Sequence, residues 1–292
     1  MGEPASTTNL TGLWGHPFID LAPFIDTSSF PRLHEEVCLG YAQVPVEYTG
    51  GCHRAMGIMP QGLENTALVD YREVIEAFDD AAYARFRALA DDPGALPETR
   101  EGGGVYGEEA DHPLSRRQML WLKVRYGVYF PWKGYLELIP NRYWSDKANA
   151  EGKDFTRVAK AYFPETIAFV KSLPFERIGR CNVMGLEGGD HGTIHRDGDP
   201  AEQTDPDEFI TFCPGAVSAV AQPKRLFLYG AGGERIYAPS HCYWFNDHDY
   251  HGVESDTFFR YSIRVDGSFT PEFRARIQAS LSSPSPAAPP AT

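Results

Sequence analysis

From about Ile178 onward, the chain is a succession of short strand-like runs with no room for helices between them. Turn residues separate the runs, for example Ala-Gly-Gly at 231–233 and Asn-Asp at 246–247. Strands that follow one another in this way pair antiparallel and form a sandwich or jelly roll. The runs are RCNVMGL (180–186), GTIHRD (192–197), EFITFC (208–213), KRLFLYG (224–230), ERIYAP (234–239), HCYWF (241–245) and TFFRYSIRVD (257–266).

The first half of the chain mixes helical periodicity with loops. Residues 71–90 predict a helix with apolar side chains at helical spacing, among them Val74 and Phe78. Ser115 and Gln118 predict a capping box before a short helix. Residues 154–173 also predict a helix, which Pro164 divides by serving as the first residue of the second piece.

These patterns predict an α+β fold in which helices support a β-core. We expect a mixed helical region over 14–177 that packs on a core over 178–279. Residues 1–13 are predicted to be flexible. The Pro/Ala/Ser tail over 280–292 is of low complexity and is predicted to be disordered.

Charge and composition exclude several classes of partner. The formal net charge is −13, and Lys and Arg do not cluster, whereas nucleic-acid binding requires a basic face. No apolar run approaches the ~20 residues that span a bilayer, and no secretory signal opens the chain. The five cysteines are an odd number without a C-x-x-C pair, which favours free thiols in a reducing cytoplasm. We therefore expect a cytoplasmic protein with no nucleic-acid or membrane partner.

His195 and Asp197 are the first residues that suggest chemistry. They are separated by one residue in the predicted strand 192–197, and positions i and i+2 of a strand face the same side. His251 lies at the end of another candidate strand. Two histidines and one carboxylate make up the facial triad of non-haem iron(II) oxygenases, which leaves positions open for a bidentate cosubstrate and dioxygen.

Other residues could replace members of this triad. Asp199 could stand in for Asp197, but the flanking Gly198 and Pro200 argue against a continuing strand. His248 could stand in for His251. The glycines around His191 argue against a helical metal pair with His195, so we place His191 in a loop or at a pocket rim.

Arg260 and Ser262 share one face of the predicted strand 257–266. A 2-oxoacid that chelates iron through one end leaves a distal carboxylate, for which an arginine fork and a hydroxyl are suitable partners. The alternate positions of the strand, from Tyr261 to Val265, suit a core. Arg264 and Arg225 are further possible pocket cations, although ordinary ion pairs are the default for both.

The triplets HRD (195–197), HGV (251–253) and RYS (260–262) resemble the H-x-D … H … R-x-S signature of the 2-oxoglutarate-dependent, iron(II) dioxygenase superfamily. The run 243–266 also resembles the late strands of its double-stranded β-helix, including those of aspartyl/asparaginyl β-hydroxylase-like members. The resemblance covers roughly residues 178–268, and the first 177 residues match nothing that we can name.

This resemblance implies a double-stranded β-helix core, which is a jelly-roll, cupin-like architecture. It implies that His195, Asp197 and His251 bind Fe(II), and that Arg260 and Ser262 bind the distal carboxylate of 2-oxoglutarate. Halogenating members of the superfamily lack the carboxylate ligand, so Asp197 favours hydroxylation or a related oxidation, such as desaturation or cyclisation, over halogenation. The β-hydroxylase branch commonly lacks it too, so Asp197 departs from the pattern of that branch.

Three functions follow as hypotheses. The leading one is a dioxygenase that uses 2-oxoglutarate and O2 and releases succinate and CO2. It would hydroxylate a small molecule, such as an amino acid or natural-product intermediate, with a peptide hydroxylase as a variant. The second is a cupin-like metalloenzyme that uses no 2-oxoacid and in which Arg260 is structural. The third is a non-catalytic β-sandwich binding module.

Residues around the motif have secondary expectations. Asn182 and Met184 precede the motif on a strand and could line the pocket, although core packing is the expected role of Met184. The aromatic-rich stretch 121–144 could cover the substrate, although core packing is its expected role. The acidic loop 197–208 could form a lid over the metal or a solvated turn.

Overall fold

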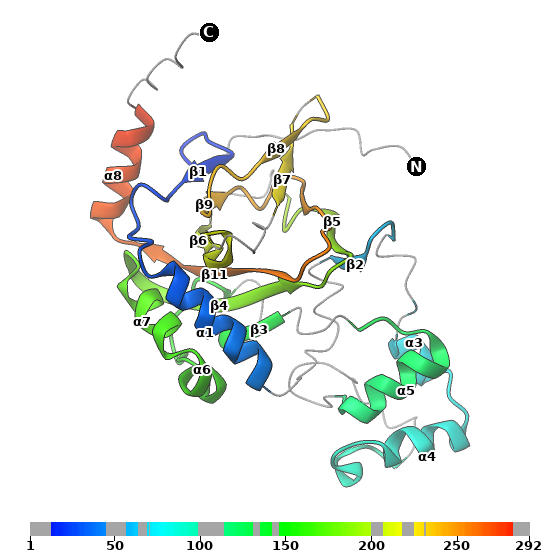
Figure 1. Cartoon of the computed structure of the whole chain (residues 1–292). Helices are drawn as coiled ribbons and strands as arrows, with labels where there is room; N and C mark the ends of the chain where they lie inside the picture. Colours follow the sequence, from blue (N-terminus) through cyan, green and yellow to red (C-terminus); the bar gives the residue numbers. More distant parts are fainter. Residues whose placement is uncertain are drawn as a thin grey trace.

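In the computed structural model, two antiparallel sheets face each other, and helices cover the larger one (Figure 1). The structure describes residues 13–44, 57–63, 69, 71–98, 114–130, 135–141, 146–199, 207–217, 225–230 and 232–282. This mixture of helices and antiparallel sheets is the predicted α+β class.

The larger sheet has the strand order β1-β9-β6-β11-β4-β3 within the described residues. Its strands are Phe18–Asp20 (β1), Cys242–Phe245 (β9), Glu208–Phe212 (β6), Arg260–Phe269 (β11), Phe175–Leu186 (β4) and Tyr135–Ile139 (β3). The smaller sheet has the order β2-β5-β10-β7-β8. Its strands are Ile58–Pro60 (β2), Asp190–His195 (β5), His251–Val253 (β10), Leu226–Tyr229 (β7) and Arg235–Tyr237 (β8).

From β4 to β11 the chain passes repeatedly between the two sheets. Strands β4, β6, β9 and β11 lie in the larger sheet, whereas β5, β7, β8 and β10 lie in the smaller one. The crossing makes β5 and β10 neighbours although they are far apart in the sequence, with His195 directly opposite His251. The two halves of the histidine motif are therefore adjacent because of topology.

Strand β11 forms the middle of the larger sheet and shows the predicted alternation. Tyr261, Ile263 and Val265 are buried in the apolar core. Helices α1 (Phe30–Gln43), α6 (Arg157–Tyr162) and α7 (Pro164–Ser172) lie on this side of the sheet, with Phe30 stacked on Phe212 (Figure 1). Since successive side chains of a strand point to opposite faces, Arg260, Ser262 and Arg264 face the smaller sheet.

Helices α3 (Tyr71–Glu76), α4 (Asp80–Ala88) and α5 (Arg116–Tyr126) form a second apolar core of their own (Figure 1). The single helix predicted over 71–90 is wrong, because the chain turns at 77–79 and Asp79 caps α4 by accepting the amide of Ala82 at 2.7 Å. A short 3-10 turn, Pro93–Ala95 (η2), follows α4.

Two predicted local signals are confirmed. Ser115 and Gln118 form the capping box at the start of α5, and Pro164 is the first residue of α7. At α5 the Ser115 and Gln118 side chains accept backbone amides that have no partner within the helix, and at α7 Pro164 has no amide hydrogen that would need a partner. These signals are local and need no tertiary context.

The ends of the predicted regions differ from expectation. Strands β1, β2 and β3 come from the mainly helical first half, yet they pair with β9, β5 and β4. The terminal helix α8 (Pro271–Ser282) continues into the stretch predicted to be disordered, so that prediction is wrong for 280–282. Residues 1–12 and 283–292 lie outside the described residues, and the domain division at 178 stays a prediction.

A second 3-10 turn, Pro214–Val217 (η6), follows β6. Within the described residues, every helix is too short or too polar to cross a bilayer.

Glu36 on α1 joins that helix to the start of α7. Its carboxylate accepts the amides of Glu165 and Thr166, both at 2.7 Å, and the Thr166 hydroxyl at 2.6 Å. We expect Glu36→Ala to lower the free energy of unfolding by about 1–2 kcal/mol, since it removes a charged N-terminal cap. Urea denaturation measures this. The control is Glu35→Ala, an exposed neighbour on the same helix, and an equal loss in both variants would contradict the cap.

Asp190, at the start of β5, accepts a hydrogen bond from the Tyr129 hydroxyl, which follows α5. Burial is the main cause that raises the pKa of Asp190 to about 6; the neighbouring Glu187 adds to the shift, and the hydrogen bond from Tyr129 opposes it. The folded state then binds more protons than the unfolded chain between pH of about 4 and 6.

This Asp190 contribution to stability falls as pH rises through that window. Asp190→Asn removes the titration and keeps an acceptor for Tyr129. We expect the variant to gain about 2 kcal/mol over the wild type on going from pH of about 4 to about 7. Urea unfolding at both pH values measures the difference, and parallel behaviour of the two proteins would contradict the assignment.

Candidate metal centre

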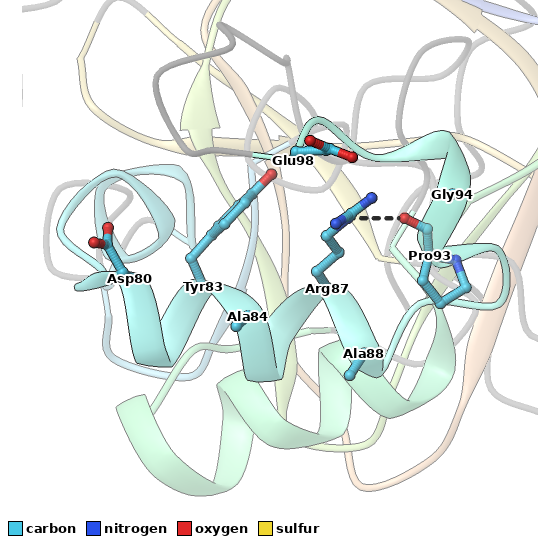
Figure 2. A pocket seen from close by; sticks show the side chains of 8 residues that line it. All are labelled: Asp80, Tyr83, Ala84, Arg87, Ala88, Pro93, Gly94 and Glu98. Atoms are coloured by element: carbon cyan, nitrogen blue, oxygen red, sulfur yellow. Dashed lines mark hydrogen bonds between the residues drawn. The ribbon is translucent and has the colours of Figure 1, made fainter.

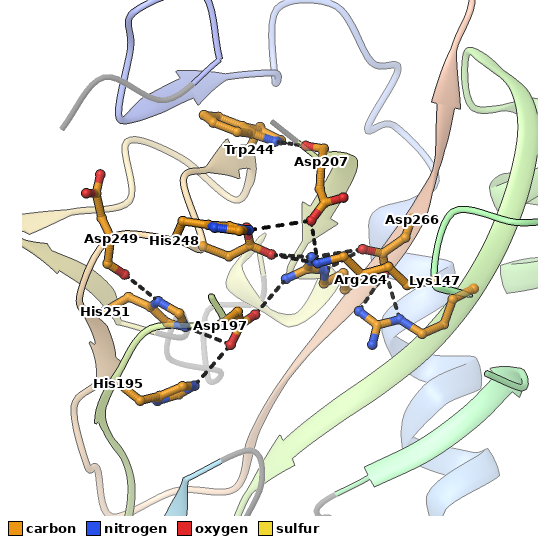
Figure 3. A network of polar contacts seen from close by, with 12 residues as sticks. Lys147, His195, Asp197, Asp207, Trp244, His248, Asp249, His251, Arg264 and Asp266 are labelled. Carbon is orange, nitrogen blue, oxygen red and sulfur yellow. Dashed lines mark hydrogen bonds and ion pairs between the residues drawn. The ribbon is translucent and has the colours of Figure 1, made fainter. Parts of the chain in front are cut away.

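His195, Asp197 and His251 come together between the two sheets (Figure 3). His195 is the last residue of β5 and His251 the first of β10, and their ring centroids are 4.4 Å apart. Oδ1 of Asp197 lies 3.5 Å from Nε2 of His195 and 3.9 Å from Nε2 of His251. One carboxylate oxygen and two imidazole nitrogens therefore point at a shared position.

The predicted reason for this arrangement is partly wrong. β5 ends at His195, so Asp197 is not on a strand and does not share a strand face with the histidine. Instead, the amide of Asp197 donates to the carbonyl of Asp247 at 2.8 Å. This bond fixes the turn after β5 and directs the carboxylate toward the histidines.

Backbone carbonyls determine which nitrogen each histidine offers. Nδ1 of His195 lies 2.8 Å from the carbonyl oxygen of Thr193, and Nδ1 of His251 lies 2.9 Å from that of Asp249. A carbonyl only accepts, so Nδ1 must hold the proton in both rings. Each neutral ring then presents its lone pair at Nε2, which is the nitrogen that faces Asp197. Metal-binding histidines in proteins are usually oriented in this way.

Burial and charge compete at these side chains. Burial alone would raise the pKa of Asp197, but contacts with His195, His251 and Arg264 hold that pKa well below its usual range. Burial lowers the pKa of His251 although Asp197 opposes the shift. At His195 the effect of burial is outweighed by Asp197 and the Thr193 carbonyl, so the pKa is raised. Asp197 is thus ionised at neutral pH, and His251 is neutral, as metal ligands require.

Arg264 lies beside this cluster, in a buried network of ion pairs (Figure 3). Nη1 is 3.8 Å from Oδ2 of Asp197, and Nη2 is 2.6 Å from Oδ2 of Asp247 and 2.8 Å from Oδ1 of Asp266. The expected ion pair is confirmed, and one of its carboxylates is a candidate metal ligand. Sequence reasoning missed Asp247 and Asp266, although Asp266 shares the strand face of Arg264.

The predicted cosubstrate residues lie on the same inner face of β11. Arg260 is buried and donates to the backbone carbonyl of Glu254, and Ser262 is buried completely. Across the sheet, Arg260 is opposite Leu186 and Ser262 is opposite Met184. Asn182 is opposite Arg264, so the strand expected to line the pocket contributes both Asn182 and Met184 to this face.

The alternative ligands lie elsewhere. Asp199 forms an ion pair with Arg196 at 3.7 Å and is largely exposed. His191 lies on β5 and not in the predicted loop; it is opposite Met59 of β2 and is not part of the group formed by His195, Asp197 and His251. Arg225 pairs with Glu254 at 3.2 Å, which is the structural role expected for it. Most of the acidic loop proposed as a lid, residues 200–206, lies outside the described residues.

His248 belongs to a second cluster with Asp207 and Asp247. A cation already occupies this cluster, since Nζ of Lys147 lies 2.6 Å from Oδ2 of Asp207 and 3.2 Å from Oδ2 of Asp247. The ammonium neutralises the carboxylates that a metal would need. Of the two groups found among the described residues, only the one with His195 and His251 combines two oriented imidazoles with a carboxylate.

Two pockets in the described part of the chain do not contain these residues. Figure 2 shows one that is lined by α4 and the segment after it, where Nε of Arg87 donates to the carbonyl of Pro93 at 2.9 Å. Its lining includes Tyr83 and Glu98 but neither histidine nor cysteine. The second lies between α1 and the α6–α7 region. Neither offers a set of metal ligands.

The aromatic stretch 121–144 contributes Trp121, Tyr126 and Phe130 to the core formed by α3, α4 and α5, as expected.

No protein-family model matches the sequence, and no curated protein matches it either. Solved structures do match. A prolyl-4-hydroxylase from Pseudomonas putida is 11% identical, with 47% of this chain and 72% of that chain covered and a TM-score of 0.26. An oxidoreductase of the 2OG-Fe(II) oxygenase family from Burkholderia pseudomallei is 12% identical, with coverage of 46% and 70% and a TM-score of 0.30.

A third structure is a prolyl hydroxylase from Trichoplax adhaerens in complex with a hypoxia inducible factor peptide. It is 12% identical, with 89% of this chain and 100% of that chain covered and a TM-score of 0.27.

Proposed function

We propose that this chain is an Fe(II)- and 2-oxoglutarate-dependent dioxygenase. The decisive observation is that Nε2 of His195, Nε2 of His251 and Oδ1 of Asp197 converge while both Nδ1 atoms are held by backbone carbonyls. Two neutral imidazoles and one carboxylate are the donor set of non-haem iron(II) oxygenases. The residues present therefore fit the metal that the motif implies.

The fold supports the same proposal. Strands β4 to β11 pass between two antiparallel sheets in the manner of a jelly roll, the architecture of cupins and of the double-stranded β-helix. The candidate ligands lie on the smaller sheet and the turn after β5, while Arg260 and Ser262 face them from the larger sheet. A cosubstrate between the sheets would then contact both groups.

When bound together, iron, 2-oxoglutarate and O2 supply an oxidative decarboxylation that yields succinate and CO2 and transfers one oxygen atom to a substrate C–H bond. The protein holds the metal with His195, Asp197 and His251. Arg260 pairs with the distal carboxylate of the cosubstrate, and Ser262 donates a hydrogen bond to it. The buried surroundings of β11 exclude water from this space.

A small molecule is the predicted substrate class, with a peptide as the alternative. One of the structural neighbours was solved with a bound peptide, so a substrate screen should contain both classes. Both classes use the same metal centre and the same cosubstrate residues. The substrate class is therefore tested only after the cofactors are established.

The proposal is tested by anaerobic titration of the protein with Fe(II) and 2-oxoglutarate. We expect the weak visible charge-transfer band of the iron chelate to develop at one equivalent of each. Iron binding without this band would favour the cupin-like metalloenzyme that uses no 2-oxoacid. Failure to bind iron would overturn the enzyme proposal and leave the non-catalytic binding module.

A further inference from the structure

We propose that Arg264 is a positioning residue that restricts Asp197 to one metal-binding oxygen. The inference depends on the proposed metal centre and adds a role for a residue outside its ligand set. Arg264 does not reach the shared ligand position. It acts through Asp197, whose two carboxylate oxygens have different partners.

The two oxygens of Asp197 point in different directions. Oδ1 faces Nε2 of His195 at 3.5 Å and Nε2 of His251 at 3.9 Å. Oδ2 faces Nη1 of Arg264 at 3.8 Å. Figure 3 shows the carboxylate between the two histidines on one side and the guanidinium on the other. The oxygen beside Arg264 has a permanent positive charge next to it and is therefore disfavoured as a second metal ligand.

Arg264 is held rigidly enough to impose this orientation. Its Nε donates to Oδ1 of Asp266 at 2.9 Å, and its Nη2 lies 2.6 Å from Oδ2 of Asp247. The guanidinium also lies against the face of Phe209, with Cζ 3.6 Å from the ring centroid. The side chain is only 3% exposed, so these contacts leave it a single position.

The acidic partners of Arg264 are in turn held by other cations. Nζ of Lys147 lies 3.2 Å from Oδ2 of Asp247, and Nη2 of Arg180 lies 2.7 Å from Oδ2 of Asp266. Burying a carboxylate is costly without such partners, so each charge in the network has a counter-charge. The network therefore holds the side chain of Arg264, which belongs to β11, in place without the help of a metal.

Asp247 joins the backbone of the ligand turn to the same network. Its carbonyl accepts the amide of Asp197 at 2.8 Å, while its carboxylate binds Arg264. Asp247 thus positions the backbone of Asp197 directly and its side chain indirectly, through Arg264. A carboxylate can bind a metal through one oxygen or two, and the second oxygen would occupy a position that a bidentate cosubstrate or O2 needs.

Chemical rescue tests the inference without any turnover. In Asp197→Ala, Co(II) binding is measured by its absorption, with and without added formate, which is a small carboxylate. We expect formate to raise the Co(II) affinity of Asp197→Ala by about tenfold or more, since Arg264 remains to hold the second formate oxygen. In Asp197→Ala/Arg264→Gln, formate should change the affinity by less than about twofold.

Asp197→Ala/Arg274→Gln is the matched control. It removes an arginine that lies outside this network and pairs with Glu208, with Nε of Arg274 2.6 Å from Oε1 of Glu208. We expect formate to rescue this variant as well as it rescues Asp197→Ala, and circular dichroism verifies that each variant is folded. Equal rescue with and without Arg264, or no rescue of Asp197→Ala, would overturn the role of Arg264. Absence of Co(II) binding by the wild type would instead overturn the proposed metal centre itself.

Discussion

His251→Ala is expected to lower the affinity for Fe(II) by more than about a hundredfold. Loss of a residue that only hydrogen-bonds to a metal ligand typically lowers metal affinity about ten- to a hundredfold, and loss of the ligand itself should cost more. The imidazole of His251 is buried, and its Nε2 is fixed toward the shared position by the hydrogen bond from Nδ1 to the Asp249 carbonyl. Alanine provides no nitrogen ligand in its place. Anaerobic Fe(II) binding, followed by calorimetry or by iron content after gel filtration, measures the loss.

His248→Ala is the control for this experiment. His248 is three positions earlier and near the same turn, but it faces Asp207 and Asp247 and not the proposed iron position. We expect its removal to leave Fe(II) affinity within about threefold of the wild type. Loss of iron in His248→Ala with retention in His251→Ala would exchange the roles of the two histidines.

Arg260→Ala is expected to raise the concentration of 2-oxoglutarate needed for the charge-transfer band by about a hundredfold, or about 3 kcal/mol. The guanidinium is buried on the inner face of β11, where a distal carboxylate needs a partner of opposite charge in a dry site. Fe(II) affinity should stay unchanged, because Arg260 is not a metal ligand. The two titrations are therefore measured separately on the same protein.

Arg225→Ala serves as the control for Arg260→Ala. Arg225 pairs with Glu254, the residue whose backbone carbonyl accepts from Arg260, but its own side chain is 53% exposed. We expect the 2-oxoglutarate titration of this variant to match the wild type. An equal effect of both substitutions would indicate that Arg260 is structural, as the cupin-like alternative requires.

Many features of the molecule could be predicted from local patterns. The alternation of β11 separates Ile263 and Val265 on the core side from Ser262 and Arg264 on the inner side, because a strand has a period of two. The capping box of α5 and Pro164 at the start of α7 are equally local. The HGV triplet, which resembles the superfamily signature, includes His251 and not His248, and His251 is the histidine that lies beside His195 and Asp197.

Other expectations failed for different reasons. The stripe over 71–90 has continuous helical spacing, yet Asp79 accepts the amide of Ala82 and starts a new helix, so a local cap outweighs the apolar periodicity. Strands β1 and β2 have only three residues each, too few for a periodic signal, and they exist because β9 and β5 offer edges to pair with. A segment of this length takes its conformation from its partner strand.

The triplets HRD, HGV and RYS by themselves determine the residue types of the proposed centre and the chemistry that these types suggest. Their orientation was decided only by the tertiary structure. The backbone carbonyls of Thr193 and Asp249 determine which ring nitrogen of His195 and His251 faces the metal position. Every residue has a backbone carbonyl, so this orientation cannot be predicted from a sequence pattern. The network around Arg264 joins residues 147, 247 and 266, which only the crossing of the strands between two sheets brings together. Side-chain identity is local, whereas the direction of a lone pair and the partner of a buried charge depend on the packing of distant segments.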